Sequence, residues 1–562
     1  MPEDLRAMKN KYLVILLLIL ALAIVLRFYN LTNVPPGVNR DEASIGYTAY
    51  SLLQTGKDEY GRFLPISFQS FGDWKLPLYI YATAVSVKVF GLTEFAVRFP
   101  SAIFGILTVF LTYILVKEFL GSKQEKIALL TAFLLAISPW HLHVSRVGSE
   151  ANTAVFLTVS AVIFFLKAIK GRVWLMVPAS ILFALTYYTY AGNHIFTTLL
   201  VPGIIIFYKD KIPRNKWAYI SFLLFIILSG FIFSKTLLAA DKTKISGVSI
   251  FGDPALVHSK IELLRDQHKN SASLTSKIFH NPLVFGAERL TQNYLNAFSP
   301  DFLFIRGGTN NAHNIENFGN MYLVESIFLF VGISSLIILK RKREEKFILY
   351  WFLIAPIAAS ITKDAPHTAR MTSILPILPL VTAIGLLYFI QVVGKNSLIR
   401  FLTIAGISML FLLNFIIYMD RYFIHFPYSE AKHWGLGFKE LNDLTQKKEF
   451  VNNKVVISKP EESPYIFILF YSKYDPAKYQ KEALRYPPTG DGFVHVKEFG
   501  RFEFRHIDWS SEIRVPGKLL VDSPIMISDF TKKQKFKTQE IILPNKEVMF
   551  TGVEIDDRQI IP

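Results

Sequence analysis

Residues 12–28 read YLVILLLILALAIVLRF, and the charged motif NRDE follows at residues 39–42. The first stretch is apolar over nearly its whole length, as a helix that crosses about 30 Å of hydrocarbon must be. Arg6, Lys9 and Lys11 precede this stretch, which is longer than the core of a signal peptide. We therefore expect an uncleaved first membrane span with a cytoplasmic N-terminus, and a charged cluster beyond its outer end.

Apolar runs of this kind recur along the chain. It has 562 residues, 51% hydrophobic and 19% charged, which excludes a single soluble domain and a disordered chain. Further runs suited to a membrane span begin near Ser101, Ile127, Ala151, Val173, His194, Trp217, Met321, Phe347, Met371 and Leu398. Together with the first span, they predict an α-helical polytopic membrane protein with about eleven transmembrane helices.

Basic residues between the runs indicate which loops lie inside. The net charge of +17 would suggest a nucleic-acid partner on a soluble protein, but here the excess lies in alternate short loops. These loops carry Lys117, Lys123 and Lys126; Lys167, Lys170 and Arg172; Lys209, Lys211, Arg214 and Lys216; Lys340, Arg341, Lys342, Arg343 and Lys346; and Lys395 and Arg400. The opposite short loops carry only Arg146, Lys363 and Arg370. By the positive-inside rule, segments 30–100 and 238–320 and the chain after about residue 420 lie outside the plasma membrane, and we expect no nucleic-acid partner.

Residues 76–92 form an apolar stretch that does not fit this alternation. If they crossed the membrane, the N-terminus and the loop at Lys117 would demand opposite orientations. We therefore predict an interfacial or re-entrant helix, in agreement with the charged Lys88 within the stretch. The alternative is an error of one in the number of spans elsewhere.

The tail after residue 425 has the composition of a soluble domain. Strands are predicted at 454–458, 465–471, 493–504, 518–521 and 540–543, between Pro, Gly and charged turns. We thus predict a membrane domain at 1–425, with large outer loops at about 30–100 and 238–320, and an extracytoplasmic α/β domain at 426–562. The chain has no cysteine, which excludes disulfides and a thiol nucleophile.

The densest chemical cluster is Asn39, Arg40, Asp41 and Glu42, just past the first span. A carboxylate held near the membrane surface can take a proton from an acceptor hydroxyl, which is the general-base step of transfer to an alcohol. The alternative is structural, because Asp41 stands where the N-cap of a following helix would be.

Two further clusters lie at outer helix ends. The first is HLHVSRVGSE at residues 141–150, where Arg146 and Glu150 either serve a site or pair with each other. The second is KDAPHTAR at residues 363–370, which is basic on the outer side. Basic residues there suggest a fixed anionic partner such as a lipid phosphate, the alternatives being an ion pair with Asp364 or contact with lipid headgroups.

Several motifs carry a family resemblance in their order and spacing. They are DEA at 41–43, WKLPLY at 74–79, the run from Phe90 to Ser101, SRVGSE at 145–150 and FSPDFLFIRG at 298–307. Together they resemble the bacterial branch of the dolichyl-phosphate-mannose protein mannosyltransferase family, which is related to the aminoarabinose lipid A transferases and has the GT-C fold. The resemblance covers about residues 10–430, and the tail matches no family.

The resemblance implies an integral-membrane glycosyltransferase that uses a sugar linked to polyprenyl phosphate. Carried over position by position, Asp41 would be the catalytic base and Glu42 its neighbour. Glu150 would match the acidic position of the second outer loop, where the family often has Asp. Lys75 matches a basic position before a proline step. Arg40 would keep Asp41 ionised if their side chains meet.

The same resemblance implies the rest of the reaction. Lys75, His367 and Arg370 would meet the charge that develops on the departing lipid phosphate, with Arg146 a further substrate contact. Single displacement implies inversion at the sugar. The acceptor would be a protein, a glycolipid or a polysaccharide, with membrane lipids as partners. No metal site is predicted, and a divalent cation is the one cofactor left open.

Two other functions remain open from the residues alone. A non-enzymatic lipid or solute carrier would place polar groups at the bilayer midplane or in broken helices, and the predicted spans carry few such groups. An oligosaccharide ligase or polymerase would share the architecture and differ in its acceptor.

The topology can be tested with single cysteines, because the chain has none of its own. We expect cysteines at positions 58, 310 and 480 to react with an impermeant thiol reagent from outside, and cysteines at 212 and 342 to react only after permeabilisation. Labelling of position 480 only after permeabilisation would contradict the whole orientation.

Overall fold

The computed structural model describes residues 3–238, 249–268, 270–338, 342–393, 396–489, 492–527 and 536–555. The chain forms two compact units: Met1–Tyr29 with Ser101–Met419 (unit 1), and Asn30–Pro100 with Asp420–Pro562 (unit 2). The first outer loop therefore groups with the C-terminal tail. Of the basic residues used for the topology, Lys340, Arg341 and Lys395 lie outside the described residues.

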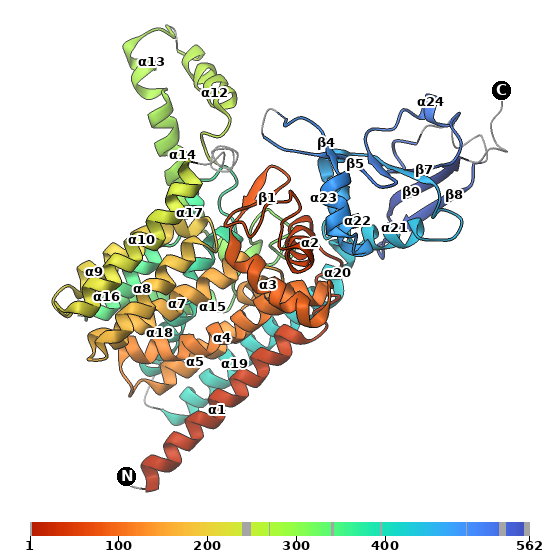
Figure 1. The fold of residues 1–562 in the computed structure, drawn as a ribbon. Helices are drawn as coiled ribbons and strands as arrows, with labels where there is room; N and C mark the ends of the chain where they lie inside the picture. Colours follow the sequence, from red (N-terminus) through yellow and green to blue (C-terminus); the bar gives the residue numbers. More distant parts are fainter. Residues whose placement is uncertain are drawn as a thin grey trace. The chain divides into compact units, whose positions relative to one another are not determined.

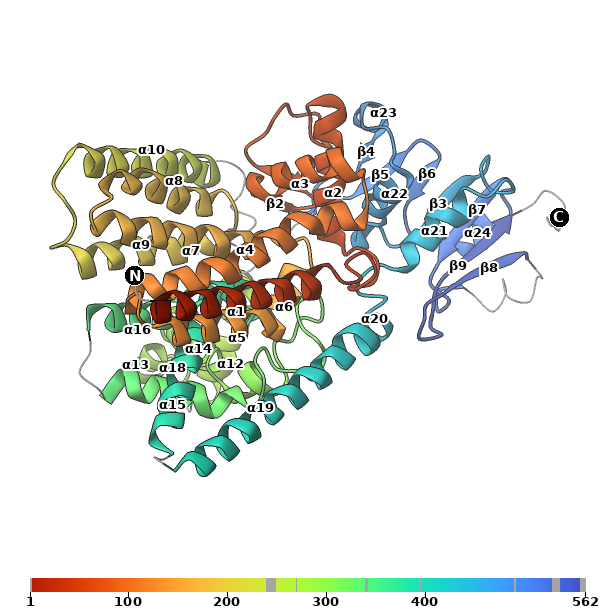
Figure 2. The ribbon, with the colours of Figure 1, turned by 90° about the horizontal axis from the view of Figure 1, so that it is seen from below.

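Unit 1 is built of helices (Figures 1 and 2). They are α1 (Glu3–Phe28), α4 (Glu94–Leu120, whose first turns belong to unit 2), α5 (Glu125–Ile137), α6 (Pro139–Ser145), α7 (Glu150–Ile169), α8 (Met176–Tyr187), α9 (Gly192–Tyr208), α10 (Lys216–Leu238), α12 (Pro254–Asp266), α13 (Leu274–Phe279), α14 (Pro282–Asn296), α15 (Glu325–Ile338), α16 (Arg343–Ile354), α17 (Ile357–Ser360), α18 (Ile377–Val392) and α19 (Ser397–Asp420). Helices α12, α13 and α14 extend away from the other helices of the unit (Figure 1).

Among the described residues, five helices are long and apolar enough to cross a membrane, or six if α5 and α6, bent by 60° at their junction, form one span. The five lie in α1, α4, α7, α10 and α19. Prolines shorten others, because proline removes a backbone donor and clashes with the preceding turn: Pro139 begins α6 and Pro356 separates α16 from α17. The α-helical polytopic class is confirmed, while the total of about eleven spans stays a prediction.

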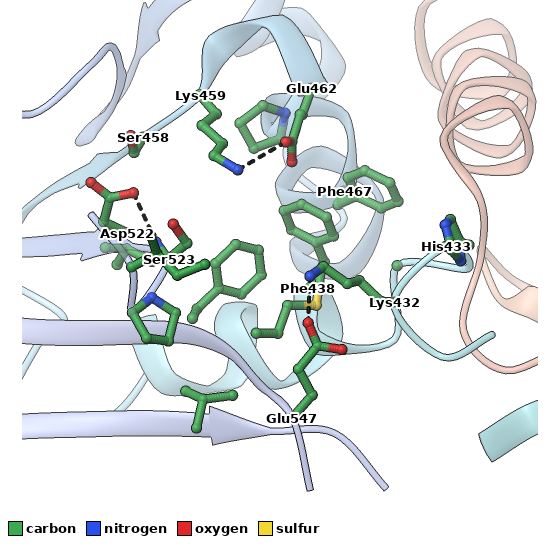
Figure 3. A pocket seen from close by; sticks show the side chains of 18 of the residues that line it. Lys432, His433, Phe438, Ser458, Lys459, Glu462, Phe467, Asp522, Ser523 and Glu547 are labelled. Atoms are coloured by element: carbon green, nitrogen blue, oxygen red, sulfur yellow. Dashed lines mark hydrogen bonds and ion pairs between the residues drawn. The ribbon is translucent and has the colours of Figure 1, made fainter. Parts of the chain in front are cut away.

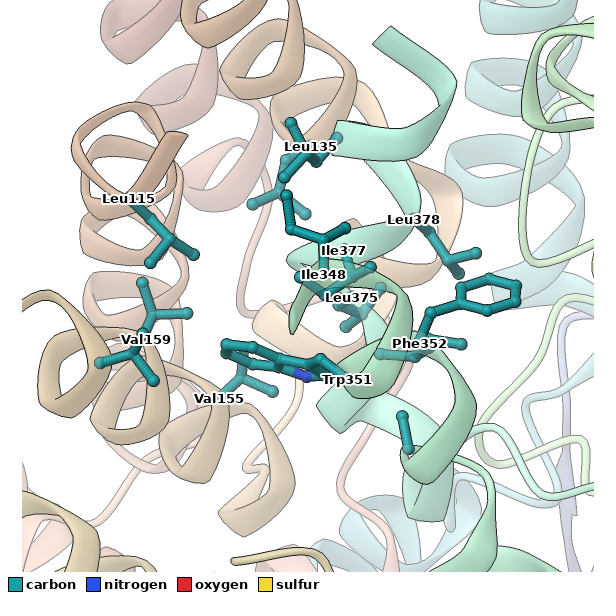
Figure 4. Packing of buried hydrophobic residues seen from close by; sticks show 14 of the residues in the cluster. Leu115, Leu135, Val155, Val159, Ile348, Trp351, Phe352, Leu375, Ile377 and Leu378 are labelled. Carbon is teal, nitrogen blue, oxygen red and sulfur yellow. The ribbon is translucent and has the colours of Figure 1, made fainter. Parts of the chain in front are cut away.

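The interior of unit 1 is closely packed and apolar (Figure 4). Trp351 of α16 is 1% exposed or less, and its indole Nε1 donates a hydrogen bond to the backbone oxygen of Ser373 at 2.8 Å. Leu115 of α4, Val159 of α7 and Ile377 of α18 belong to the same buried cluster. Helices far apart in the sequence thus share one core, and the indole nitrogen of Trp351 is satisfied within it.

Two glycines bring α15 and α18 into close contact. A Cβ atom added at Gly385 would lie 1.9 Å from the backbone oxygen of Phe328, and one at Gly332 would lie 2.1 Å from that of Val381. Small residues allow the backbones of apolar helices to approach in this way. In a membrane the hydrophobic effect does not favour helix association, so van der Waals contact between closely packed helices stabilises it instead.

The Gly385→Ala variant should therefore lose stability. We expect a cost of about 1–3 kcal/mol from overpacking, seen as a lower midpoint of thermal unfolding for the protein in micelles. Gly406 of α19 is the matched control, since a Cβ there meets nothing within 4 Å. Gly406→Ala should leave the midpoint unchanged or raise it, because alanine favours the helix. Equal shifts in the two variants would contradict the packing.

Unit 2 contains a sheet and the helices around it. The first outer loop supplies α2 (Arg40–Thr55), the hairpin β1 (Phe68–Ser70) and β2 (Asp73–Lys75), and α3 (Pro77–Phe90). The tail supplies α20 (Phe426–Ser429), α21 (Gly437–Thr445), β3 (Lys454–Ile457), α22 (Pro464–Ser472), α23 (Pro476–Glu482), β4 (Leu484–Arg485), β5 (Val496–Phe499), β6 (Phe502–Phe504), α24 (Trp509–Glu512), β7 (Lys518–Asp522), β8 (Thr538–Ile542) and β9 (Val548–Ile555). The sheet order is β4-β5-β6-β3-β7-β9-β8, with β3 parallel to both of its neighbours.

The C-terminal α/β class is confirmed, but two predicted strands differ: the stretch 493–504 is the antiparallel hairpin of β5 and β6, and the strand at 465–471 is wrong. Residues 465–471 form most of α22, with Pro464 in its first turn. Residues Tyr465 to Phe470 are all buried, so the run carries no alternation of apolar and polar positions. A short, fully apolar run fits a buried strand and a buried helix equally well. The stretch is helical here, and Pro464 favours this outcome because proline suits the first turn of a helix.

The stretch that broke the predicted alternation is α3, which has 14 residues. At 1.5 Å per residue it reaches about 21 Å, too short to cross the hydrocarbon core. Val85 and Val89 are 68% and 69% exposed, so one side of the helix presents apolar side chains. These features agree with the predicted interfacial helix.

Candidate active site

The predicted base lies in the first turn of α2. Asn39 is the N-cap of this helix, and its side-chain oxygen accepts a hydrogen bond from the backbone N of Glu42 at 2.9 Å. The alternative prediction that Asp41 is the cap is therefore wrong. The side chain of Asp41 is 61% exposed. Its carboxylate is thus accessible, and the positive end of the helix dipole favours it there.

Lys75 is an ion-pair partner of Asp41. Its Nζ donates to Asp41 Oδ1 at 2.7 Å, and the lysine side chain is only 4% exposed. The β1–β2 hairpin positions it, since Lys75 ends β2 and α3 begins two residues later. Arg40, which we expected beside Asp41, places its guanidinium 4.8 Å from the centre of the Phe71 ring. A nearby ammonium favours the ionised form of a carboxylate, which is the form that a base needs.

Glu42 points the other way, into unit 2. Arg98 donates to both of its oxygens, from Nε to Oε1 at 3.0 Å and from Nη2 to Oε2 at 2.9 Å. The two side chains are 1% exposed or less. A carboxylate held in this way is poorly placed to accept a proton from an incoming acceptor. The geometry therefore favours a positioning role for Glu42 over a catalytic one.

Arg98 also fixes the loop that leads into α2. Its guanidinium donates to the backbone oxygens of Leu31, Pro35 and Gly37, at 3.0, 2.8 and 2.5 Å. One buried side chain thus joins the start of α4 to residues 31–37 and to the first turn of α2. The sequence analysis did not single out Arg98, although an arginine at the head of a long apolar helix is costly and marks a specific partner.

Two of the predicted site residues lie around α6 and α7 in unit 1. Arg146 is fully buried, and its Nη1 donates to the backbone oxygens of Leu26 and Arg27 at 2.7 and 3.1 Å. Glu150 is the first residue of α7 and is partly exposed. Arg146 therefore ties the end of α6 to the end of α1, which is a structural use of a residue predicted to contact substrate.

The third cluster is also held by internal pairs. Arg370 forms an ion pair with Asp364 and donates to Thr362 Oγ1 at 2.9 Å. Burial lowers the pKa of His367 to about 3, with His313 and Arg370 acting in the same direction. His367 is therefore neutral at physiological pH and supplies no positive charge to a phosphate. The predicted pairing of Arg370 with Asp364 is present.

The predicted residues thus fall into two sets. Arg40, Asp41, Glu42 and Lys75 come together in unit 2, and Arg146, Glu150, His367 and Arg370 belong to unit 1. In the part of the chain that the structure describes, no group of three or more His, Cys, Asp or Glu side chains is arranged to hold a metal ion.

The model of the family described as dolichyl-phosphate-mannose-protein mannosyltransferase matches residues 75–233. Two solved structures share the fold. ArnT from Cupriavidus metallidurans bound to undecaprenyl phosphate matches with a TM-score of 0.55 and 12% identity, over 97% of this chain and 99% of that one. The oligosaccharyltransferase AglB from Archaeoglobus fulgidus matches with a TM-score of 0.51 and 15% identity, over 82% and 64%.

Curated relatives match parts of the chain. An uncharacterized protein of Aquifex aeolicus is 29% identical over 240 residues, 40% of this chain and 44% of that protein. The putative mannosyltransferase YkcB of Bacillus subtilis is 29% identical over 175 residues, 30% of this chain and 23% of its own. The chain thus matches less than half the length of these relatives. The matches confirm the resemblance to this mannosyltransferase family over part of the chain, and the two solved structures show that the fold is the GT-C fold.

The two acidic neighbours of α2 should differ in what they do for stability. Glu42→Ala leaves the buried Arg98 without its main counter-ion, and removing one partner of a buried pair costs about 3–5 kcal/mol. Asp41→Asn changes a carboxylate that is 61% exposed and keeps an oxygen that can accept a hydrogen bond from the buried Lys75, so we expect a smaller loss of stability. Thermal unfolding of the two variants in the same micelles measures the difference. A larger loss for Asp41→Asn would contradict the assignment of Glu42 as the structural partner.

Proposed function

We propose that the protein transfers a sugar from a polyprenyl-phosphate-linked donor to an acceptor hydroxyl at the outer face of the plasma membrane, with Asp41 as general base. The observation that carries the proposal is the asymmetric ion pair of Asp41 and Lys75. The carboxylate is 61% exposed, while the ammonium that holds it is 4% exposed. The acid is therefore fixed and charged, yet open to a substrate.

The donor class is supported by the neighbours of the fold. ArnT is described as bound to undecaprenyl phosphate, and AglB as in complex with dolichol-phosphate. Mannose is the sugar favoured by the family description and by the name of YkcB. A sugar linked to a lipid phosphate is already activated, so no nucleotide is needed outside the cytoplasm.

The reaction follows as a single displacement. The acceptor hydroxyl gives its proton to Asp41 while its oxygen forms the new bond to the anomeric carbon. The bond from that carbon to the phosphate oxygen breaks, and polyprenyl phosphate leaves with the electron pair. Attack opposite the leaving group inverts the configuration at the anomeric carbon.

Cations would stabilise the charge that grows on the phosphate. Lys75 is the first candidate, since its ammonium lies 2.7 Å from Asp41 Oδ1 and therefore beside the reacting acid. Arg370 is the second candidate, although Asp364 already offsets part of its charge. His367 is withdrawn from this set because it is neutral. Glu150 remains a candidate to orient the sugar.

The Asp41→Asn variant tests the proposal. Asparagine keeps the size of the side chain but accepts no proton, and loss of a general base costs about 10²–10⁴-fold in rate. We expect this loss in sugar transfer from a radiolabelled polyprenyl-phosphate sugar, with donor binding retained. Since Asn39 caps α2, a capping effect cannot explain the loss.

Glu150→Gln in the same membranes serves as the comparison, because it changes a carboxylate in the same way at the other candidate acid. Near-normal transfer by Asp41→Asn would refute the catalytic assignment, whatever the behaviour of Glu150→Gln.

A further inference from the structure

Unit 2 contains a pocket of about 550 Å³ that the proposed reaction does not use (Figure 3). It lies at the carboxyl ends of β3 and β7, which are parallel neighbours with Ile457 opposite Val521. Ser458 and Asp522 line it immediately where the two strands end. Open α/β sheets bind their ligands at this edge, and the volume is that of a small-molecule site.

Part of the pocket lining is aromatic and apolar. The rings of Phe438 in α21 and Phe467 in α22 are stacked, with centroids 4.0 Å apart and planes 1° apart. Phe550 of β9 lies against Phe438, with centroids 5.0 Å apart. Met549 and the exposed Ile525 extend the apolar lining. Phe438 and Phe467 are only 5% and 4% exposed, so the partly exposed Phe550 and the exposed Ile525 are the side chains that can contact the C–H groups of a ligand.

The rest of the lining is polar and balanced in charge. Besides His433, it contains the basic residues Arg40, Lys432 and Lys459 and the acidic residues Glu462, Asp522 and Glu547. Lys459 pairs with Glu462 at 3.2 Å, and Lys432 pairs with Glu547 at 2.5 Å (Figure 3). Paired charges offer many donors and acceptors but no net field, so this lining suits a neutral polyol better than a phosphate or a carboxylate.

The pocket also adjoins the proposed base within unit 2. Arg40 lines the pocket, and it is the first residue of α2, directly before Asp41. The pocket and the proposed base thus involve adjacent residues of α2. This continuity connects the pocket to the acceptor side of the reaction.

We propose that this pocket is a saccharide-binding site that holds a neutral glycan of the acceptor, the C–H groups of its sugar rings lying against the apolar lining at Phe550 and Ile525 and its hydroxyls bonded to the charged rim. The acceptor role rests on the proposed function, while sugar binding does not. An extended peptide is disfavoured, because peptides of that form add to a sheet edge. The edges of this sheet are β4 and β8, and the pocket lies at the ends of central strands.

Binding can be measured by saturation-transfer NMR on the full chain in lipid nanodiscs, free of detergents with sugar headgroups. The probes are cellobiose, α-1,2-mannobiose and N,N′-diacetylchitobiose, with a Ser/Thr-rich peptide in a parallel sample. We expect at least one disaccharide to receive saturation on its ring protons. Ser523→Trp, which fills the pocket, should abolish the signal. Ser510→Trp, on an exposed serine of α24 outside the lining, should leave it unchanged.

A second pair of variants covers the case in which Ser523→Trp does not fold. Lys459→Ala should raise the Kd about tenfold, as expected for the loss of a charged hydrogen bond. Lys497→Ala, at an exposed position of β5 outside the pocket, should not change it. The proposal is overturned if no disaccharide binds, if the pocket variants bind like their controls, or if only the peptide gives a pocket-dependent signal.

Cleavage of the lipid-linked donor by water separates the two proposals, since it needs Asp41 but no acceptor. Donor cleavage without disaccharide binding would refute the saccharide site and leave the transferase intact. Pocket-dependent binding with no donor cleavage or transfer would refute the proposed function and leave the saccharide site standing.

Discussion

The fully buried guanidinium of Arg98 is the constraint on which the candidate site depends. Burying an unpaired charge is far more costly than the few kcal/mol that stabilise a domain, so every donor must find an acceptor. Glu42 and the backbone oxygens of residues 31–37 provide these acceptors. These hydrogen bonds fix the loop before α2 and the first turn of the helix. Asp41, one residue before Glu42, then has its position set by a pair in which it takes no part.

The two neighbouring carboxylates of α2 thus have different roles: Glu42 forms a buried ion pair, and Asp41 remains accessible. Consecutive side chains on a helix point in different directions, so one acid can be buried while the next is exposed. Glu42 is used to hold the turn together, and Asp41 is left open with Lys75 beneath it. This division explains why a motif with two adjacent acids suits a site at a membrane surface. A single acid could not be both buried in a salt bridge and accessible to an acceptor.

The C-terminal tail and the first outer loop fold together as one compact unit. Contacts group residues 30–100 with the tail, and Tyr47 of α2 donates to the backbone oxygen of Tyr474 at 3.1 Å. Gly37 lies so close to Trp434 that a Cβ there would be 2.7 Å from its backbone oxygen. Since the loop that bears Asp41 folds against the α/β domain, changes in the tail can reach the first turn of α2. The pocket beside Arg40 lies on this shared structure.

The sequence alone determined the membrane class, the charged cluster and the family resemblance. A helical membrane protein needs long apolar helices and basic inner loops. The membrane class can therefore be predicted from local composition, and the family resemblance from the order of motifs. Tertiary structure alone decided which charges meet. Lys75 is 34 residues from Asp41 and Arg98 is 56 residues from Glu42, and no local pattern encodes such pairs. It also made residues 465–471 a helix rather than a strand, and it neutralised His367 by burial. Each of these outcomes depends on what packs against a residue from elsewhere in the chain, because burial and charge partners, unlike hydrophobic periodicity, are properties of the folded neighbourhood.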